Sequence, residues 1–281
     1  HFPVEPYSLI LPLIKNFFIS NIFYAIGTYT LELQSNLKTK LIFYFAKKSF
    51  DKVIFLSSFS KFNIEEKINF NLTKTKIIIN PIINLRKANY SVNKKFNNKT
   101  ILSVGEIKPR KGYHYLIEVL NIINNKLKKN YDLIIIGKSD NPRYFNKLKN
   151  TVKKYKLEKN VKFKINIDES KIKNFFLKSH IFVLLPKKIG NFFEGFGIVY
   201  LEALHYGLPI IISKESGAKD LLKITKKILV VRPDNLDLIS KKIIKITNDK
   251  KKNYIKLGDI ILKKHLYFNK KKFKNLYSKL K

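Results

Sequence analysis

The stretch NFFEGFGIVYLEALHYGLPIIIS, residues 191–213, decides the fold of this chain. It predicts a loop, then a helix that begins near Gly197, then a buried strand formed by LPIIIS. The loop carries one carboxylate, Glu194, and the helix carries another, Glu202. Gly195 and Gly197 allow the backbone to turn tightly and to approach a ligand closely. The stretch therefore indicates a ligand site at the end of a parallel strand, where such sheets bind their ligands.

The same alternation of strand and helix continues on both sides. Short apolar runs that are typical of buried parallel strands occur at residues 100–105, 131–137, 160–165, 181–186 and 228–231. Helical spacing of apolar residues occurs at residues 112–127, 143–157, 168–179, 197–206 and 236–247. Asp168 is placed to cap the third of these helices. Because strands and helices alternate on short connections, we expect a doubly wound parallel α/β sheet.

The beginning of the chain carries a shorter version of this pattern. We expect helices at residues 7–18, 33–50 and 61–70 and strands at residues 21–26, 52–57 and 76–80. These elements make up about half of a Rossmann-like domain, without an early strand and its glycine-rich loop. Since the chain also begins at His1 rather than at a methionine, we interpret it as part of a longer protein.

Three parts of the chain follow from these elements. Residues 1–97 form a partial N-terminal Rossmann-like domain, which ends in a polar, basic hinge at residues 81–99. Residues 98–247 form a complete C-terminal Rossmann-like domain. Residues 248–281 form helices that pack back towards the N-terminal domain, because an apolar stripe runs among their lysines.

The composition excludes several classes of protein. A hydrophobic content of 45% over 281 residues excludes a disordered chain. The absence of cysteine excludes disulfide bonds and thiolate metal sites. The most apolar window, residues 7–26, is interrupted by Pro12, Lys15 and Asn16, so we do not expect it to span a membrane.

The formal charge of +37 has two interpretations. It would suit binding to nucleic acid or to an anionic membrane. Alternatively it reflects A/T-rich coding, since Asn and Ile are as abundant as Lys and the lysines are spread over the whole chain. The second interpretation is favoured, and we expect no specific nucleic-acid site. Attraction to an anionic membrane would follow from the charge whatever its origin.

The two carboxylates are placed to face one extended ligand. Glu202 lies about 8 Å along the helix axis from the helix start near Gly197. The free N–H groups at a helix start bind anions, phosphates above all. A nucleotide sugar has a matching length, with its diphosphate at the helix start, its sugar by Glu194 and its ribose by Glu202. The alternative is a chance pair of glutamates beside an ordinary βαβ unit.

The spacing Glu-x7-Glu within EGFGIVYLEALHYGLPII resembles the signature of family 4 glycosyltransferases of the GT-B fold. Three further segments are similar to parts of that family, namely SVGEIKPRKGYHYLIEVL at residues 103–120, DKVIFLSSFSK at 51–61 and ESGAKDLL at 215–222. The resemblance spans about residues 20–245. It implies a GT-B enzyme of two Rossmann-like doubly wound domains, the N-terminal one incomplete here, which would bind a donor but transfer sugar poorly.

The resemblance also implies roles for individual residues. Lys111 matches the lysine that holds the donor diphosphate, and Arg110 would assist it. Glu194 would bind hydroxyl groups of the transferred sugar, which makes Lys111 and Glu194 the predicted catalytic residues, and Glu202 would bind the ribose. The other donor-binding residues implied are Gly105, Phe196, Gly197 and Ile198, and, at strand ends near the base, Gly137, Lys138 and Lys164. The acceptor side would include Gly27 and Thr28. For the segment KPRKG, a solvated basic turn is the alternative.

The chain departs from the family pattern at three places. Glu106 stands where the family usually has an arginine, and it would repel phosphate unless it turns away. Ile26 stands where many members carry a histidine on the acceptor side. The glycine pair of a later loop is reduced to Ser216 and Gly217.

Other chemistries find little support. The chain has no Asp-x-Asp triplet, no His/Cys cluster suited to zinc and no P-loop. The resemblance implies a retaining, metal-independent glycosyltransferase of polysaccharide biosynthesis without a cofactor, which uses a nucleotide-diphosphate sugar and a glycan or lipid-linked acceptor. A sugar-nucleotide-binding protein without transfer activity is the alternative. We expect a cytoplasmic location. For the lysine-rich C-terminal helix, peripheral contact with the inner face of an anionic membrane is the alternative to packing on the N-terminal domain.

Overall fold

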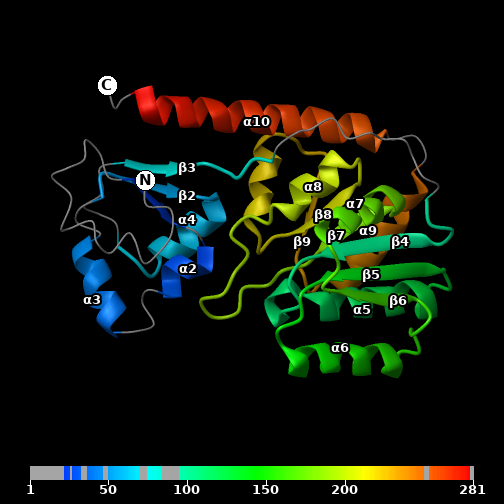
Figure 1. Ribbon diagram of the computed structural model, residues 1–281. Coiled ribbons are helices and arrows are strands. Elements are labelled where there is room, and N and C mark those ends of the chain that lie inside the picture. The colour runs from blue at the N-terminus through cyan, green and yellow to red at the C-terminus, as the bar shows by residue number, and fades with distance from the viewer. Residues whose placement is uncertain are drawn as a thin grey trace.

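The computed structural model describes residues 22–25, 27–32, 37–46, 50–69, 75–83, 95–249 and 253–278. In these residues the chain forms a three-stranded and a six-stranded sheet, both of them parallel. The two sheets lie side by side, and one long helix, α10 (Tyr254–Ser278), runs along both (Figure 1). The predicted class, parallel α/β, is confirmed.

The six-stranded sheet has the order β6-β5-β4-β7-β8-β9. Its strands are β4 (Lys99–Val104), β5 (Tyr131–Gly137), β6 (Val161–Ile165), β7 (Ile181–Leu184), β8 (Ile210–Ser213) and β9 (Leu229–Val231). The strand order reverses between β4 and β7, where Ile101 pairs with Ile181 and Leu102 with Phe182. Parallel sheets open a crevice at the carboxyl ends of the strands at such a switch point.

Helices cover both faces of this sheet (Figure 1). They are α5 (Tyr113–Asn121), which continues as a π-helical turn (Ile122–Lys126), α6 (Pro142–Lys154), α7 (Glu169–Lys178), α8 (Val199–His205) and α9 (Leu236–Asn248). Asp168 caps α7 as predicted, since its carboxylate accepts a hydrogen bond of 2.8 Å from the N–H of Ser170. The apolar faces of α5 and the strands meet in a fully buried core, for example at Leu116 and Ile135.

The three-stranded sheet has the order β1-β2-β3, with β1 (Ile22–Ala25), β2 (Lys52–Phe55) and β3 (Thr75–Ile78). Its helices are α2 (Gly27–Glu32), α3 (Leu37–Ala46) and α4 (Ser58–Glu65). Aromatic rings fill its core, where Phe23 stacks on Phe50 with ring centres 4.6 Å apart. These elements form a second, smaller core beside the larger one.

Several predicted boundaries in this part were wrong. The helix predicted at residues 61–70 begins at Ser58, because the hydroxyl of Ser57 caps it by accepting the N–H of Ser60 at 2.9 Å. The helix predicted at residues 33–50 is shorter, and α2 precedes it without having been predicted. The helix predicted at residues 7–18 and most of the predicted hinge lie outside the described residues.

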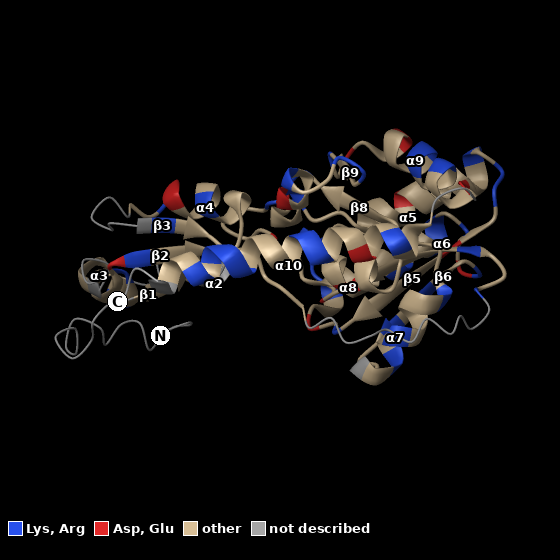
Figure 2. Cartoon of the chain, turned by 90° about the horizontal axis from the view of Figure 1, so that it is seen from above, with Lys and Arg blue, Asp and Glu red and all other residues tan. Residues whose placement is uncertain are grey.

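The helix α10 runs along both parts of the molecule, the part with the three-stranded sheet and the part with the six-stranded sheet (Figures 1 and 2). Its first half packs against α8. Further along, the side-chain oxygen of Asn269 accepts the N–H of Asn80 at 2.9 Å, and Leu276 packs with Ile22 and Ile54. No helix in the described part of the chain is long and apolar enough to cross a membrane. The domain limits at residues 97 and 247 stay predictions.

Candidate functional site

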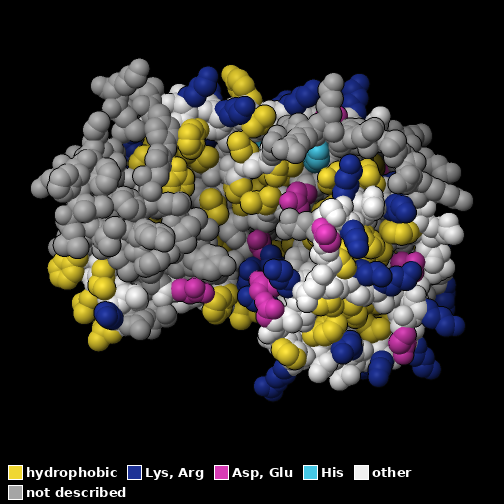
Figure 3. Space-filling view, in the orientation of Figure 1, with side chains coloured by type: hydrophobic (Ala, Val, Ile, Leu, Met, Phe, Trp, Pro, Cys, Tyr) yellow, Lys and Arg dark blue, Asp and Glu magenta, His cyan; other side chains and the backbone are white. Residues whose placement is uncertain are grey.

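A cavity of about 720 Å³ lies beyond the carboxyl end of β4 and beside α7 and α8. It is lined by Ile83, Val104, Gly105, Lys111, Ile172, Lys173, Phe176, Glu194, Gly197, Ile198, Val199, Glu202, His205 and Tyr206. Basic and acidic side chains gather on the face of the molecule where its two parts meet (Figure 3). The cavity therefore brings together six of the predicted site residues: Gly105, Lys111, Glu194, Gly197, Ile198 and Glu202.

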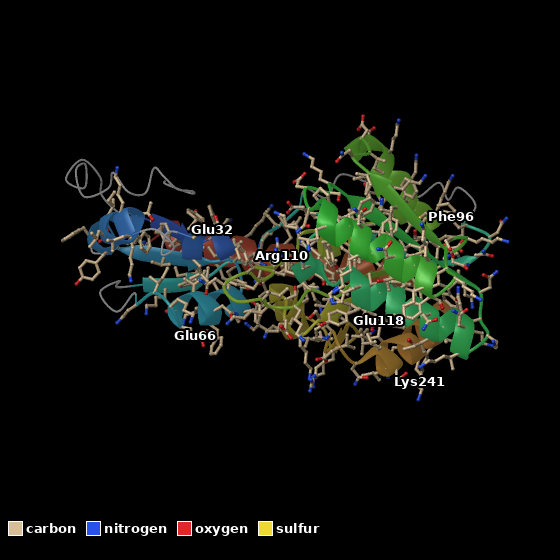
Figure 4. All side chains as sticks on the ribbon, turned by 90° about the horizontal axis from the view of Figure 1, so that it is seen from below. Glu32, Glu66, Phe96, Arg110, Glu118 and Lys241 are labelled. Atoms are coloured by element: carbon tan, nitrogen blue, oxygen red, sulfur yellow. The ribbon has the colours of Figure 1, made fainter. Side chains whose placement is uncertain are left out.

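A buried charge cluster forms the centre of the site. The Nζ of Lys111 donates a hydrogen bond of 2.5 Å to Oε2 of Glu194, and the Nη1 of Arg110 donates one of 3.0 Å to the same oxygen. Glu194 and Lys111 are each only 9% exposed. Arg110 lies at the junction of the two parts of the molecule (Figure 4). Two cations and one carboxylate thus share a largely buried site with a net positive charge.

The pKa of Glu194 is set by two opposing effects. Burial raises the pKa of this carboxyl, but the charges and hydrogen bonds of Lys111 and Arg110 lower it by more, so that the pKa lies below its usual value. Glu194 is therefore ionised at neutral pH. An ionised carboxylate accepts hydrogen bonds from sugar hydroxyls, whereas a protonated one would donate as well as accept.

The segment that carries Lys111 depends on a glycine. The residues Pro109–Lys111 form a 3-10 turn that ends at Gly112, whose φ is +74°. A Cβ atom at Gly112 would lie 2.0 Å from the carbonyl oxygen of Leu185, directly after β7. Only glycine fits this close approach and this backbone conformation. The contact brings the loop after β4 against the loop after β7 and so places Lys111 beside Glu194.

Glu106 is turned towards another residue of its own loop. Its Oε1 forms an ion pair of 2.5 Å with Nζ of Lys108. Among the described residues that line the cavity, Glu106 does not appear. The expected repulsion of a phosphate is therefore reduced, because Lys108 neutralises this charge nearby.

Five other predicted donor-binding residues do not line the cavity within the described part of the chain: Arg110, Phe196, Gly137, Lys138 and Lys164. Arg110 acts at the site through Glu194, as above. Phe196 is buried, with its ring 5.8 Å from the ring of His265. Gly137 supports the loop after β4, since a Cβ atom there would lie 1.9 Å from the carbonyl oxygen of Gly105. Lys138 and Lys164 are exposed, and their contact with a base stays a prediction.

The predicted acceptor-side residues lie near the loop that carries Glu194. A Cβ atom at Gly27, the first residue of α2, would be 3.8 Å from the Cα of Gly195. The side chain of Thr28 and the whole of Ile26 lie outside the described residues. The acceptor roles of Gly27 and Thr28 stay predictions.

Sequence reasoning missed the apolar end of the cavity. Ile172 and Phe176 on α7 and Tyr206 after α8 line it, and the rings of Phe176 and Tyr206 stack with centres 5.4 Å apart. The apolar spacing of residues 168–179 predicts a helix but does not tell which apolar residues face a ligand rather than the sheet.

The helix α8 is also shorter than predicted. It begins at Val199 rather than near Gly197, and it has 7 residues. The charged side chains at this end of the site are Lys111, Arg110 and Glu194. In the described ranges, no group of three or more His, Cys, Asp or Glu side chains could hold a metal ion. Metal independence stays a prediction.

The chain is similar to several proteins of known class. The model of the family Glycosyl transferases group 1 matches residues 86–258. An uncharacterized glycosyltransferase of Haemophilus influenzae is 29% identical over 217 residues, which are 77% of this chain and 57% of that protein. A second one, from Methanocaldococcus jannaschii, is 29% identical over 187 residues, 63% of this chain and 45% of that protein. The chain thus spans about half the length of these relatives.

Solved structures share the fold at low sequence identity. A UDP-forming α,α-trehalose-phosphate synthase from Burkholderia xenovorans matches with a TM-score of 0.75 and 13% identity, over 97% of this chain and 71% of that one. Sucrose-phosphate synthase from Thermosynechococcus elongatus matches with a TM-score of 0.66 and 18% identity, over 92% of this chain and 67% of that one. These neighbours confirm the predicted GT-B fold. Because the family match covers more than half of the chain and includes Lys111, Glu194 and Glu202, the chain belongs to the glycosyl transferases of group 1.

Proposed function

We propose that the protein transfers a glycosyl group from a nucleotide-diphosphate sugar to an acceptor hydroxyl. One observation carries this proposal. The buried carboxylate of Glu194 is held by two cations, Lys111 and Arg110, at one side of a cavity of about 720 Å³. The cations suit a diphosphate, the carboxylate suits sugar hydroxyls, and the apolar end suits a base.

The leaving diphosphate would bind at Lys111, with Arg110 close by. Departure of a nucleoside diphosphate concentrates negative charge on its phosphate oxygens, and fixed cations in a site of low polarity stabilise that charge. The ammonium of Lys111 has three protons and uses one on Glu194, so others are free to reach phosphate oxygens. Glu194 would then tie the sugar to the same cations that hold the diphosphate.

The rest of the donor would extend along α8. Glu202 lines the cavity beyond Gly197 and would accept hydrogen bonds from the ribose. The base would lie against Ile172, Phe176 and Tyr206, whose side chains form the apolar end. We assign the base to this end rather than to Lys138 and Lys164.

The finer assignments are also proposals. The spacing of Glu194 and Glu202 supports family 4, for which the expected outcome is retention at the anomeric carbon. Lys111 and Arg110 would supply the positive charge at the diphosphate, which makes the reaction independent of a metal ion. The acceptor would be a glycan or a lipid-linked saccharide that approaches from the side of Gly27.

Calorimetry with UDP, GDP and ADP, followed by hydrolysis of the corresponding sugar nucleotides, tests this function. We expect one of the nucleotides to bind and its sugar donor to be hydrolysed slowly without an acceptor. Glu194→Gln should abolish hydrolysis, while Glu158→Gln, a change of an exposed glutamate, should not. Binding without hydrolysis by the unaltered chain would favour the alternative, a sugar-nucleotide-binding protein. Binding of no nucleotide would overturn both.

A further inference from the structure

The loop between β7 and α8 links the two sheets. It leaves the six-stranded sheet after Leu184, returns to it at Val199 and extends towards α2 on the way (Figure 1). We call residues 187–197 of this loop the coupling loop. Glu194 lies within it, so the position of the catalytic carboxylate depends on what holds the loop.

Phe193, directly before Glu194, belongs to the core of the smaller sheet. Its side chain is 2% exposed and packs in the cluster that contains Phe23, Phe55 and Ile64. Its ring meets that of Phe59 edge to face, with centres 5.8 Å apart. A residue of the coupling loop is thus part of the hydrophobic core of the smaller sheet.

Gly195, directly after Glu194, is held by α4 and its cap. Its carbonyl oxygen accepts hydrogen bonds from the hydroxyl of Ser57, at 2.6 Å, and from the hydroxyl of Ser60, at 2.9 Å. Both hydroxyls are buried. The two neighbours of Glu194 in the chain are therefore both anchored in the three-stranded sheet and its helix.

The larger part of the molecule also holds this peptide. The N–H of Gly217 donates a hydrogen bond of 3.1 Å to the carbonyl of Glu194. A Cβ atom at Gly217 would lie 1.9 Å from the carbonyl oxygen of Gly195 and 2.3 Å from the hydroxyl of Ser57. Segments from both parts meet here without room for a methyl group, so a shift of one part would displace the backbone of Glu194.

We propose that Phe193, Ser57 and Ser60 are positioning residues that place Glu194 against Lys111 and Arg110 only while the two sheets are docked. The donor site would then be completed by the N-terminal part of the chain, although Lys111 and Arg110 come from the C-terminal part. The catalytic consequence rests on the proposed function, but the positioning itself does not. A misplacement of about 1 Å in a reacting geometry can lower a rate about 100-fold.

A second contact between the two parts, which we call the Asp220 clamp, allows the coupling loop to be tested separately from docking. The carboxylate of Asp220 accepts hydrogen bonds from the N–H of Ser58 at 2.7 Å and from the side-chain amide of Asn80 at 3.1 Å. This contact also joins the two parts and does not involve Phe193. Loss of the Phe193 side chain should therefore free the loop while the two parts stay together.

The matched variants are Phe193→Ala, Phe193→Leu and Phe192→Ala. Phe192 is the neighbouring ring, and it is 50% exposed. Since the chain has no cysteine, spin labels attach only to the cysteines that are introduced for the measurement. The pair Phe62→Cys and Ile189→Cys reports the distance from α4 to the coupling loop, and the pair Phe62→Cys and Leu222→Cys reports docking. All three of these side chains are exposed.

We expect Phe193→Ala to broaden the distance distribution between α4 and the loop and to leave the docking distance narrow. Phe193→Leu should restore the narrow loop distance, and Phe192→Ala should not change it. Donor hydrolysis at saturating sugar nucleotide should fall at least about tenfold in Phe193→Ala, while the affinity for the nucleoside diphosphate changes less than about threefold.

A narrow loop distance in Phe193→Ala would overturn the proposal, whether or not any donor is hydrolysed. If the unaltered chain hydrolyses none of the donors, the proposed function fails, and the distance measurement still decides the positioning. If Phe193→Ala does not fold, Ser60→Ala carries the same readouts, since it removes one of the two hydrogen bonds to Gly195. A loop distance and hydrolysis rate like those of the unaltered chain in Ser60→Ala would then contradict the inference.

Discussion

At the scale of single residues, the site depends on how one carboxylate shares two cations. Oε2 of Glu194 accepts hydrogen bonds from both Lys111 and Arg110. Both cations are therefore already paired with a carboxylate before any ligand binds. A ligand phosphate can add to the cluster without leaving a buried charge unpaired. The net positive charge of the cluster supports the proposed binding of a diphosphate, and Glu194 fixes the positions of the two cations.

Lys111→Ala should weaken the binding of the nucleoside diphosphate by about 1.5–3 kcal/mol, because a charge-assisted contact with a phosphate is lost. Calorimetry with whichever of UDP, GDP and ADP binds measures the loss. Lys159→Ala is the control, since Lys159 is an exposed lysine that does not line the cavity. Equal affinities in Lys111→Ala and the unaltered chain would remove Lys111 from the site.

Glu194→Gln and Glu202→Gln should affect different steps. Glu194 contacts the cations at the diphosphate end, so its change should lower donor hydrolysis far more than nucleotide affinity. Glu202 lies farther along the cavity, so its change should lower nucleotide affinity more. Hydrolysis rates and calorimetry on both variants check this division, and identical behaviour of the two would show it to be wrong.

The stability of the protein should depend on the ionisation of Glu194 in acid. Its pKa in the folded chain is lowered from the ordinary value of 4.5, so its contribution to stability is present above about pH 4.5 and is lost as the pH falls through the folded value. The difference in unfolding free energy between the unaltered chain and Glu194→Gln should therefore shrink in acid. Urea unfolding at several pH values measures it, and Asp220, whose pKa is also lowered, contributes equally to both proteins. A difference that stays constant with pH would argue against the ion pairs.

At the scale of elements, close contacts between loops set the site. Gly112 and Gly190 both have positive φ, +74° and +57°, but their surroundings differ. A Cβ atom at Gly112 would meet the carbonyl of Leu185 at 2.0 Å, whereas one at Gly190 would meet nothing within 4 Å. The first glycine is required by packing and conformation together, the second by conformation alone.

Gly190→Ala should cost about 1–2 kcal/mol of stability through backbone strain. Gly112→Ala should cost about 1–3 kcal/mol more, because the methyl group forces the 3-10 turn away from the end of β7. Urea unfolding compares the two variants. Equal costs would mean that the turn at Lys111 shifts freely, and Lys111 would then not be fixed by this contact.

At the scale of the whole molecule, a buried polar contact joins the two parts. Asp220 is 4% exposed and accepts hydrogen bonds from the N–H of Ser58 and from the amide of Asn80, at 2.7 and 3.1 Å. The helix α10 joins the same parts through Asn269 and Leu276. The relative position of the two sheets therefore rests on specific buried groups as well as on apolar packing.

Asp220→Ala should lower stability by about 2–4 kcal/mol, since it leaves the N–H of the half-buried Ser58 and the side-chain amide of the buried Asn80 without this acceptor. Asp234→Ala is the control, because Asp234 forms ion pairs with Arg232 and Lys187 at a partly exposed position and should change stability by less than about 1 kcal/mol. Urea unfolding of both variants makes the comparison. If Asp220→Ala is no more costly than Asp234→Ala, the junction does not depend on this clamp.

The sequence by itself determined the fold class, a parallel α/β protein, and most of the elements of the larger sheet. Parallel strands such as β5 are continuous apolar runs, and the residue that caps α7 is adjacent to the helix in sequence. Both features can therefore be recognised from a few consecutive residues. Lys111, Glu194 and Glu202 could be singled out because they lie in the segments that resemble family 4 glycosyltransferases, and their roles stay predictions. Their meeting in one cavity followed from the parallel arrangement, which gathers such ends at one edge of the sheet.

Only the tertiary structure decided which groups support that chemistry. Nothing in the adjacent residues Phe192 and Phe193 tells which ring is exposed and which is buried, since the difference comes from a core that lies more than a hundred positions earlier in the chain. The hydroxyls of Ser57 and Ser60 likewise find the carbonyl of Gly195 across 138 and 135 positions. The spacing of apolar residues indicates which side of a single helix or strand is buried. Contacts between distant segments depend on how whole elements pack against one another, which the spacing does not indicate.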